Sequence, residues 1–151
     1  MVLIFSVMKI LFFVNTKLNL NNNSITGGIE SLNIELSDYF KKKKLFVILA
    51  KKISNEIQNI YWDIVISSND AKIFDKIMSK KKILWLHNKM QIEKSLRKKQ
   101  FFPILKNEIH TIFVSKYLKD ITSKIYNFKT TNVIPNFLIK NFRNIKINYN
   151  R

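Results

Sequence analysis

His87 and the adjacent glycines Gly27 and Gly28 are the residues of this chain best suited to chemistry. The imidazole of His87 can take up or release a proton near neutral pH, or donate a hydrogen bond to a hydroxyl group. The two glycines are the only ones in 151 residues and precede an expected helix. Bare backbone N–H groups there can approach a diphosphate or a sugar hydroxyl. Each feature also has a structural alternative, because the glycines can form a capped tight turn and a lone histidine can be a core residue.

Polar residues or glycines follow several apolar runs of strand length. In a parallel sheet, ligands bind beyond the carboxyl ends of the strands, so we expect these residues to converge on one edge. With His87 as the catalytic residue, the predicted substrate-binding residues are Gly27, Gly28, Ser68, Asn69, Asn88 and Ser115. The serines also suit helix caps. His110 precedes an expected strand, so it is predicted at the opposite edge as an ordinary surface residue.

Several other chemistries lack the residues that they need. The chain has no cysteine, which excludes disulfides and thiolate metal sites. No acidic residue completes a serine triad and no glycine-flanked elbow is present. Two adjacent glycines supply neither a dinucleotide fingerprint nor a phosphate-binding loop. No cluster of His, Asp or Glu has ligand spacing, so neither a metal nor a cofactor is expected.

Apolar strands alternate with amphipathic helices along the chain. The expected strands are residues 10–14, 45–50, 62–67, 83–86, 111–114 and 132–134, and the expected helices start at Gly28, after Ser68-Asn69-Asp70 and after Ser115. The second helix should present Ile73, Phe74, Ile77 and Met78, and the third should present Leu118, Ile121 and Ile125. A short helical or irregular connection is expected at 54–61. This alternation predicts an α/β fold, a Rossmann-like three-layer sandwich with a mostly parallel sheet, in one domain.

The formal net charge of +17 suggests an anionic partner. Nucleic acid is disfavoured as the main partner because arginine is scarce, and arginine forks are typical of nucleic-acid binders. Residues 89–106 combine lysines with apolar side chains, which suits either docking on anionic lipid or an ordinary outer helix. The apolar run over residues 1–14 is too short to span a bilayer and lacks the features of a secretory signal. It is predicted to contain the first buried strand, and Met8 is the expected natural start of the chain, with residues 1–7 as an extension.

The order of these segments resembles the N-terminal domain of glycosyltransferase family 4. The matching segments are MKILFFVN, GGIE opening a helix, WDIVISSN, ILWLHN, IFVS before a helix, and VIPN, which together span about residues 8–138. The resemblance implies one half of a GT-B fold, in which two Rossmann-like domains face a cleft. Members of this family move a sugar from a nucleotide-sugar donor to an acceptor without a required metal.

The resemblance also assigns roles to individual residues. It implies that Gly27 and Gly28 lie beside the donor diphosphate and the acceptor, and that His87 lies near the transferred sugar. Asn88 stands where an acidic or amide residue often follows that histidine, and Ser115 matches the serine before the next helix.

The resemblance has a departure and a limit. Phe137 stands where a glycine is common. Residues 1–138 correspond to the acceptor-side domain and 139–151 to a linker start or frayed tail, while the paired glutamates of the family's donor-binding domain have no counterpart. We therefore expect the chain to be inactive alone, either as a truncated product or as half of an enzyme that pairs with a separate donor-domain chain.

The resulting expectation is a glycosyltransferase half that acts in cell-envelope polysaccharide or glycolipid synthesis. Its partners would be a nucleotide-sugar co-substrate and a sugar or lipid-linked acceptor, and its expected location is cytoplasmic, with peripheral contact at the inner face of the membrane. The alternative is a non-catalytic Rossmann-like module that binds anionic lipid or nucleic acid through its basic surface.

Overall fold

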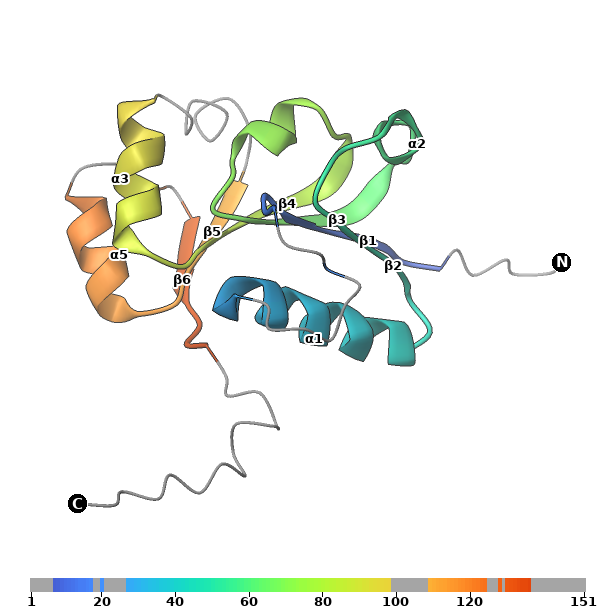
Figure 1. Ribbon diagram of the computed structural model, residues 1–151, viewed down its shortest axis with the longest axis horizontal. Helices are drawn as coiled ribbons and strands as arrows, with labels where there is room; N and C mark the ends of the chain where they lie inside the picture. Colours follow the sequence, from blue (N-terminus) through green and yellow to red (C-terminus); the bar gives the residue numbers. More distant parts are fainter. Residues whose placement is uncertain are drawn as a thin grey trace, which may run out of the picture.

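An all-parallel sheet of six strands forms the centre of the structure, a computed structural model that describes residues 7–17, 20, 27–98, 109–124, 128 and 130–136 (Figure 1). The strand order is β2-β1-β3-β4-β5-β6. The strands are β1 (Lys9–Val14), β2 (Phe46–Ala50), β3 (Trp62–Ser68), β4 (Ser79–Leu86), β5 (Ile109–Phe113) and β6 (Thr130–Val133). This sheet and its alternating helices confirm the predicted Rossmann-like α/β fold, with a sheet that is wholly parallel.

The helices divide unequally between the two faces of the sheet. They are α1 (Gly28–Lys42), α2 (Asn55–Gln58), the 3-10 turn η1 (Lys72–Asp75), α3 (Lys89–Arg97) and α5 (Lys116–Ser123). In the sheet, β2 lies on one side of β1, whereas β3, β4, β5 and β6 follow in order on the other side. Right-handed crossovers therefore put α1 on one face and the remaining elements on the opposite face (Figure 1). No helix in the described part of the chain is long and apolar enough to cross a membrane.

Both faces of the sheet carry buried apolar side chains. The larger cluster lies under α2, η1, α3 and α5 and includes Leu11, Phe13, Trp62, Val65, Ile73, Phe74, Leu84, Leu86, Ile92, Phe113 and Leu118. On the other face, Phe12 stacks on Phe40 of α1 with 6.2 Å between ring centroids. Residues of β1 are thus buried on both sides, as a central parallel strand requires.

The segment after β3 differs from the predicted helix. Only Lys72–Asp75 forms a 3-10 turn, and although Ile73, Phe74 and Ile77 are buried as expected, Met78 is 59% exposed. The reason is that the carbonyl of Met78 accepts the Trp62 N–H at 3.1 Å, so the chain is already extending to pair with β3. β4 consequently begins at Ser79, four residues before the predicted start at Ile83. Of the remaining predictions, those on Ile125, on Phe137 and on residues 99–106 and 139–151 lie outside the described residues.

Candidate functional site

A cavity of about 300 Å³ opens at the carboxyl edge of the sheet, between the first turn of α1 and the side of α3. The ends of β1 and β3 form its floor through Val14 and Ser68. Its polar walls include Asn15, Glu30, Asn69, Asp70, Lys94 and Lys98. A polar cavity at this edge of a parallel sheet is the usual location of a ligand site in α/β folds.

The carboxylate of Asp70 is held in place from two sides. Asn15 donates its side-chain amide to one carboxylate oxygen of Asp70 at 2.9 Å, and the backbone N–H of Lys72 donates to the other at 3.0 Å. Each oxygen retains a further lone pair. The end of β1 and the segment after β3 therefore present a fixed acceptor group to the cavity.

Asn69 joins the ends of β3 and β4. It adopts the left-handed backbone conformation at φ 59°, which asparagine tolerates better than most residues. Its backbone N–H donates to the carbonyl of Trp85 at 2.9 Å, and its side-chain oxygen accepts the backbone N–H of His87 at 2.8 Å. The predicted site residues Asn69 and His87 are therefore linked directly, through the backbone of His87.

The glycine pair stands at the beginning of α1, beside the carboxylate of Glu30. Gly27 is the N-cap residue with φ −63°, and neither glycine has a positive φ, so the backbone conformation does not require glycine at either position. A Cβ at Gly27 would contact the carboxylate of Glu30, whereas a Cβ at Gly28 would meet no atom of the described residues within 4 Å. Glycine at position 28 thus keeps open space at a helix N-terminus, next to the cavity residues Ile29 and Glu30.

Ser68 lines the cavity, but its hydroxyl is already engaged. The side chain of Asn33, which is fully buried on α1, donates to the Ser68 hydroxyl at 2.9 Å and to the carbonyl of Ile29 at 2.8 Å. The Ser68 hydroxyl returns a weaker hydrogen bond to Asn33 at 3.3 Å. This buried pair fixes α1 against β3, so the main role of the Ser68 side chain here is structural.

His87 lies on the α1 side of the sheet, beside Trp85. The register pairs Ser68 with Trp85, and Ser68 faces α1, so Trp85 and the residue two positions later share that side. The ring centroids of Trp85 and His87 are 4.5 Å apart. Among the described residues, neither ring nitrogen of His87 has a hydrogen-bond partner. The same holds for the indole nitrogen of Trp85, a residue that is 5% exposed. The imidazole is not part of the cavity wall.

Burial lowers the pKa of His87 to about 4, because the charged imidazolium loses its hydration there. The ring is therefore neutral at physiological pH, with one N–H donor and one acceptor nitrogen unused. A neutral imidazole of this kind is a weak base but an effective hydrogen-bonding group.

Asn88 and Ser115 act as helix caps in the structure. The side-chain oxygen of Asn88 accepts the backbone N–H of Gln91 at 2.8 Å, in the first turn of α3. The hydroxyl of Ser115 accepts the backbone N–H of Leu118 at 3.1 Å, in the first turn of α5. Neither residue lines the cavity. Among the predicted site residues, only Ser68 and Asn69 do so.

Sequence reasoning overlooked several cavity residues. Asn15 directly follows β1 and Asp70 lies two residues after β3, so the strand-end rule that selected Asn69 would also have selected them. Lys94 and Lys98 carry no such signal, because they are two of 27 basic residues in the chain. In the described segments, no group of three His, Asp or Glu side chains is arranged to hold a metal ion.

No protein-family model, curated protein or solved structure matches this chain. The fold alone places the protein in the class of α/β domains with an all-parallel, Rossmann-like sheet, here of six strands.

Proposed function

We propose that this chain is the acceptor-side domain of a glycosyltransferase of the family 4 type. In this role it moves a sugar from a nucleotide-sugar donor to an acceptor in cell-envelope polysaccharide or glycolipid synthesis. The observation that carries the proposal is the polar cavity at the carboxyl edge of the sheet, bordered by a helix N-terminus with open space at Gly28. The order of segments that resembles this family supports the same function.

The cavity residues suit the steps of sugar transfer. The fixed carboxylate of Asp70 accepts hydrogen bonds from acceptor hydroxyls, which positions them for attack. An acceptor oxygen then forms a bond to the anomeric carbon, while the bond from that carbon to the diphosphate oxygen breaks. The diphosphate leaves with the bonding electron pair and takes the hydroxyl proton, and the N–H groups in the first turn of α1 stabilise its charge. His87 lies outside the cavity wall, and only the family resemblance assigns it to the transferred sugar. With a pKa of about 4, its role there is that of a hydrogen-bonding group and not of a base.

Calorimetric titration with a panel of nucleotide sugars tests this function. The chain is titrated alone and then mixed with a neighbouring gene product that resembles a donor-binding domain. We expect binding in the mixture that weakens in His87→Ala. His110→Ala is the matched control, because His110 lies near the start of β5, at the opposite edge of the sheet. Absence of binding in both titrations would contradict the proposal.

One observation favours the alternative of a non-catalytic binding module. Met90 and Tyr117 are 73% and 68% exposed, and they lie among lysines on α3 and α5, which pack against each other (Figure 1). Apolar side chains among lysines are typical of surfaces that bind anionic lipid. Salt-sensitive binding to DNA or vesicles that is unchanged in His87→Ala would support this alternative.

A further inference from the structure

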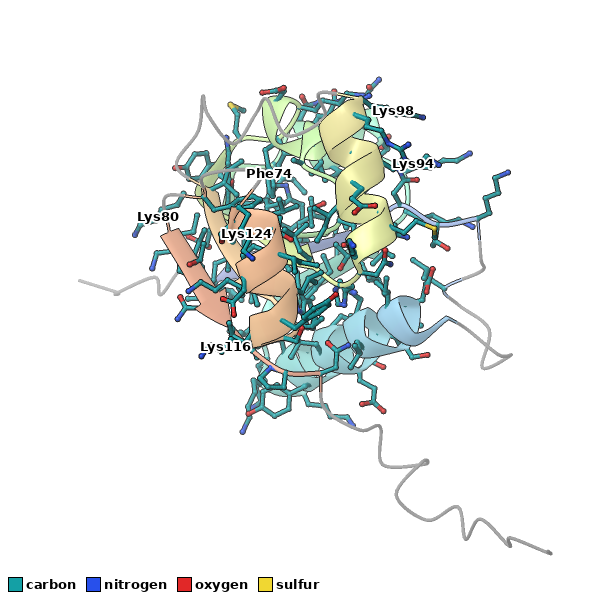
Figure 2. The ribbon with its side chains drawn as sticks, turned by 90° about the vertical axis from the view of Figure 1, so that its left-hand side faces the viewer. Phe74, Lys80, Lys94, Lys98, Lys116 and Lys124 are labelled. Carbon is teal, nitrogen blue, oxygen red and sulfur yellow. The ribbon has the colours of Figure 1, made fainter. Side chains whose placement is uncertain are left out.

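Opposite charges face the cavity from different elements. Glu30 in the first turn of α1 and Asp70 after β3 supply carboxylates, whereas Lys94 and Lys98 of the α3 region supply ammonium groups. The two lysines are four residues apart and thus project from one side of the helix. Figure 2 shows both on the side of α3 that faces away from α5. The cavity therefore has an acidic wall and a basic wall.

The two walls do not neutralise each other. The ion pairs in the described part of the chain are Lys41–Asp38 and Lys89–Glu93, so Lys94 and Lys98 pair with no carboxylate there. Asp70 is held by an amide and a backbone N–H instead of a lysine. Both charges thus remain available to a ligand that reaches across the cavity.

We propose that the acceptor bound in this cavity is a phosphorylated sugar or polyol. Its hydroxyl groups donate hydrogen bonds to Asp70, and its phosphate oxygens accept hydrogen bonds from Lys94 and Lys98. A neutral sugar would leave the lysines without an anion, and inorganic phosphate would leave Asp70 without the sugar hydroxyls that donate to it. A ligand with hydroxyls at one end and a phosphate at the other satisfies both walls. This inference rests on the proposed glycosyltransferase function and names its acceptor class.

Amide NMR titration of the whole chain tests this inference with defined probes. The phosphorylated probes are glucose 6-phosphate, N-acetylglucosamine 1-phosphate and myo-inositol 1-phosphate, and the reference ligands are glucose, myo-inositol and inorganic phosphate. We expect at least one phosphorylated probe to shift amide signals of Asn15, Asp70 and Lys94. It should bind about tenfold or more tightly than its neutral counterpart or inorganic phosphate. Vesicles containing phosphatidylinositol test whether the same polyol phosphate is presented as a lipid headgroup.

Paired variants separate a specific phosphate site from general charge attraction. The double variant Lys94→Gln/Lys98→Gln removes the basic wall. Lys116→Gln/Lys124→Gln removes the same charge from the first residue and the C-cap of α5, outside the cavity lining (Figure 2). We expect the first to weaken binding of the phosphorylated probe by about tenfold or more and the second to leave it within about twofold.

Three results would overturn the inference. Equal weakening of probe binding by both double variants would mean that the phosphate is attracted by the overall charge and not by this site. Equally tight binding of a neutral sugar would mean that the acceptor needs no phosphate group. Failure of both the soluble probes and the vesicles to bind would exclude a phosphorylated sugar or polyol as the ligand of this cavity. None of these results affects the calorimetric titration with nucleotide sugars, so failure of this inference is distinguishable from failure of the proposed function.

Discussion

Acidification is expected to destabilise this domain through His87. The pKa of His87 is about 4 in the folded chain, against an ordinary value of 6.5. Between these values the unfolded chain binds a proton that the folded chain does not bind. The free energy of unfolding therefore decreases as the pH falls through 6.5, and this loss is complete below about pH 4. The full shift corresponds to about 3 kcal/mol.

The variant His87→Leu should remove the loss of stability that His87 causes on acidification. At neutral pH it is expected to be as stable as the original chain or about 1 kcal/mol more stable, because the buried ring nitrogens of His87 lack partners among the described residues. Urea denaturation, followed by circular dichroism at a series of pH values, measures the difference between the two proteins. Comparing the proteins at each pH cancels the titration of carboxylates that they share.

The predicted result is a gap that widens in favour of His87→Leu by about 3 kcal/mol between neutral pH and pH 4. His110→Leu controls for the loss of a histidine from the opposite edge of the sheet. A gap between the original chain and His87→Leu that stays constant across this range would refute the reasoning, because it would mean that His87 titrates alike in the folded and unfolded chains.

Three further substitutions test individual contacts. Asn33→Ala should destabilise the domain by about 2–3 kcal/mol in urea denaturation, because it leaves the buried Ser68 hydroxyl without its partner; Asn55→Ala, at an exposed site, should change little. Ser115→Ala should cost about 1 kcal/mol, and Ser115→Asp should retain the cap of α5; equal losses would argue against capping. Gly28→Ala should raise the free energy of unfolding by about 0.5–1 kcal/mol, because alanine favours the helix. It should also weaken the binding of nucleotide sugar measured by calorimetry, and unchanged binding would mean that the substrate does not approach the backbone at Gly28.

Periodicity predicted the strands well where both faces of the sheet are covered. Leu11 and Phe13 pack on one side and Phe12 on the other, and the apolar run of β1 reflects this. The start of β4 was missed because Lys80 and Lys81 are exposed, so the strand begins without an apolar signal. The pattern of Ile73 and Ile77 could not distinguish an α-helix from a 3-10 turn that ends at Asp75, because both side chains are buried although Ile77 lies beyond the turn.

The strand-end rule predicted the edge that holds the cavity but not the direction of each side chain. Ser68 turns toward Asn33, and the His87 ring packs beside Trp85, because the register of β3 and β4 places Ser68 and Trp85 on the α1 side. Register depends on pairing between distant segments and is not visible in local sequence. Lys94 shows a different limit, because its importance arises only from the carboxylates across the cavity.

Sugar transfer is the most direct test of the central claim. The chain is combined with a donor-binding domain, a panel of radiolabelled nucleotide sugars, and acceptors that include sugar phosphates and lipid extract. We predict a labelled product that requires both proteins and that falls about 100-fold or more in Asp70→Asn, because the variant loses the fixed carboxylate that positions the acceptor. A donor domain that binds nucleotide sugar but yields no product with the folded chain would contradict the account.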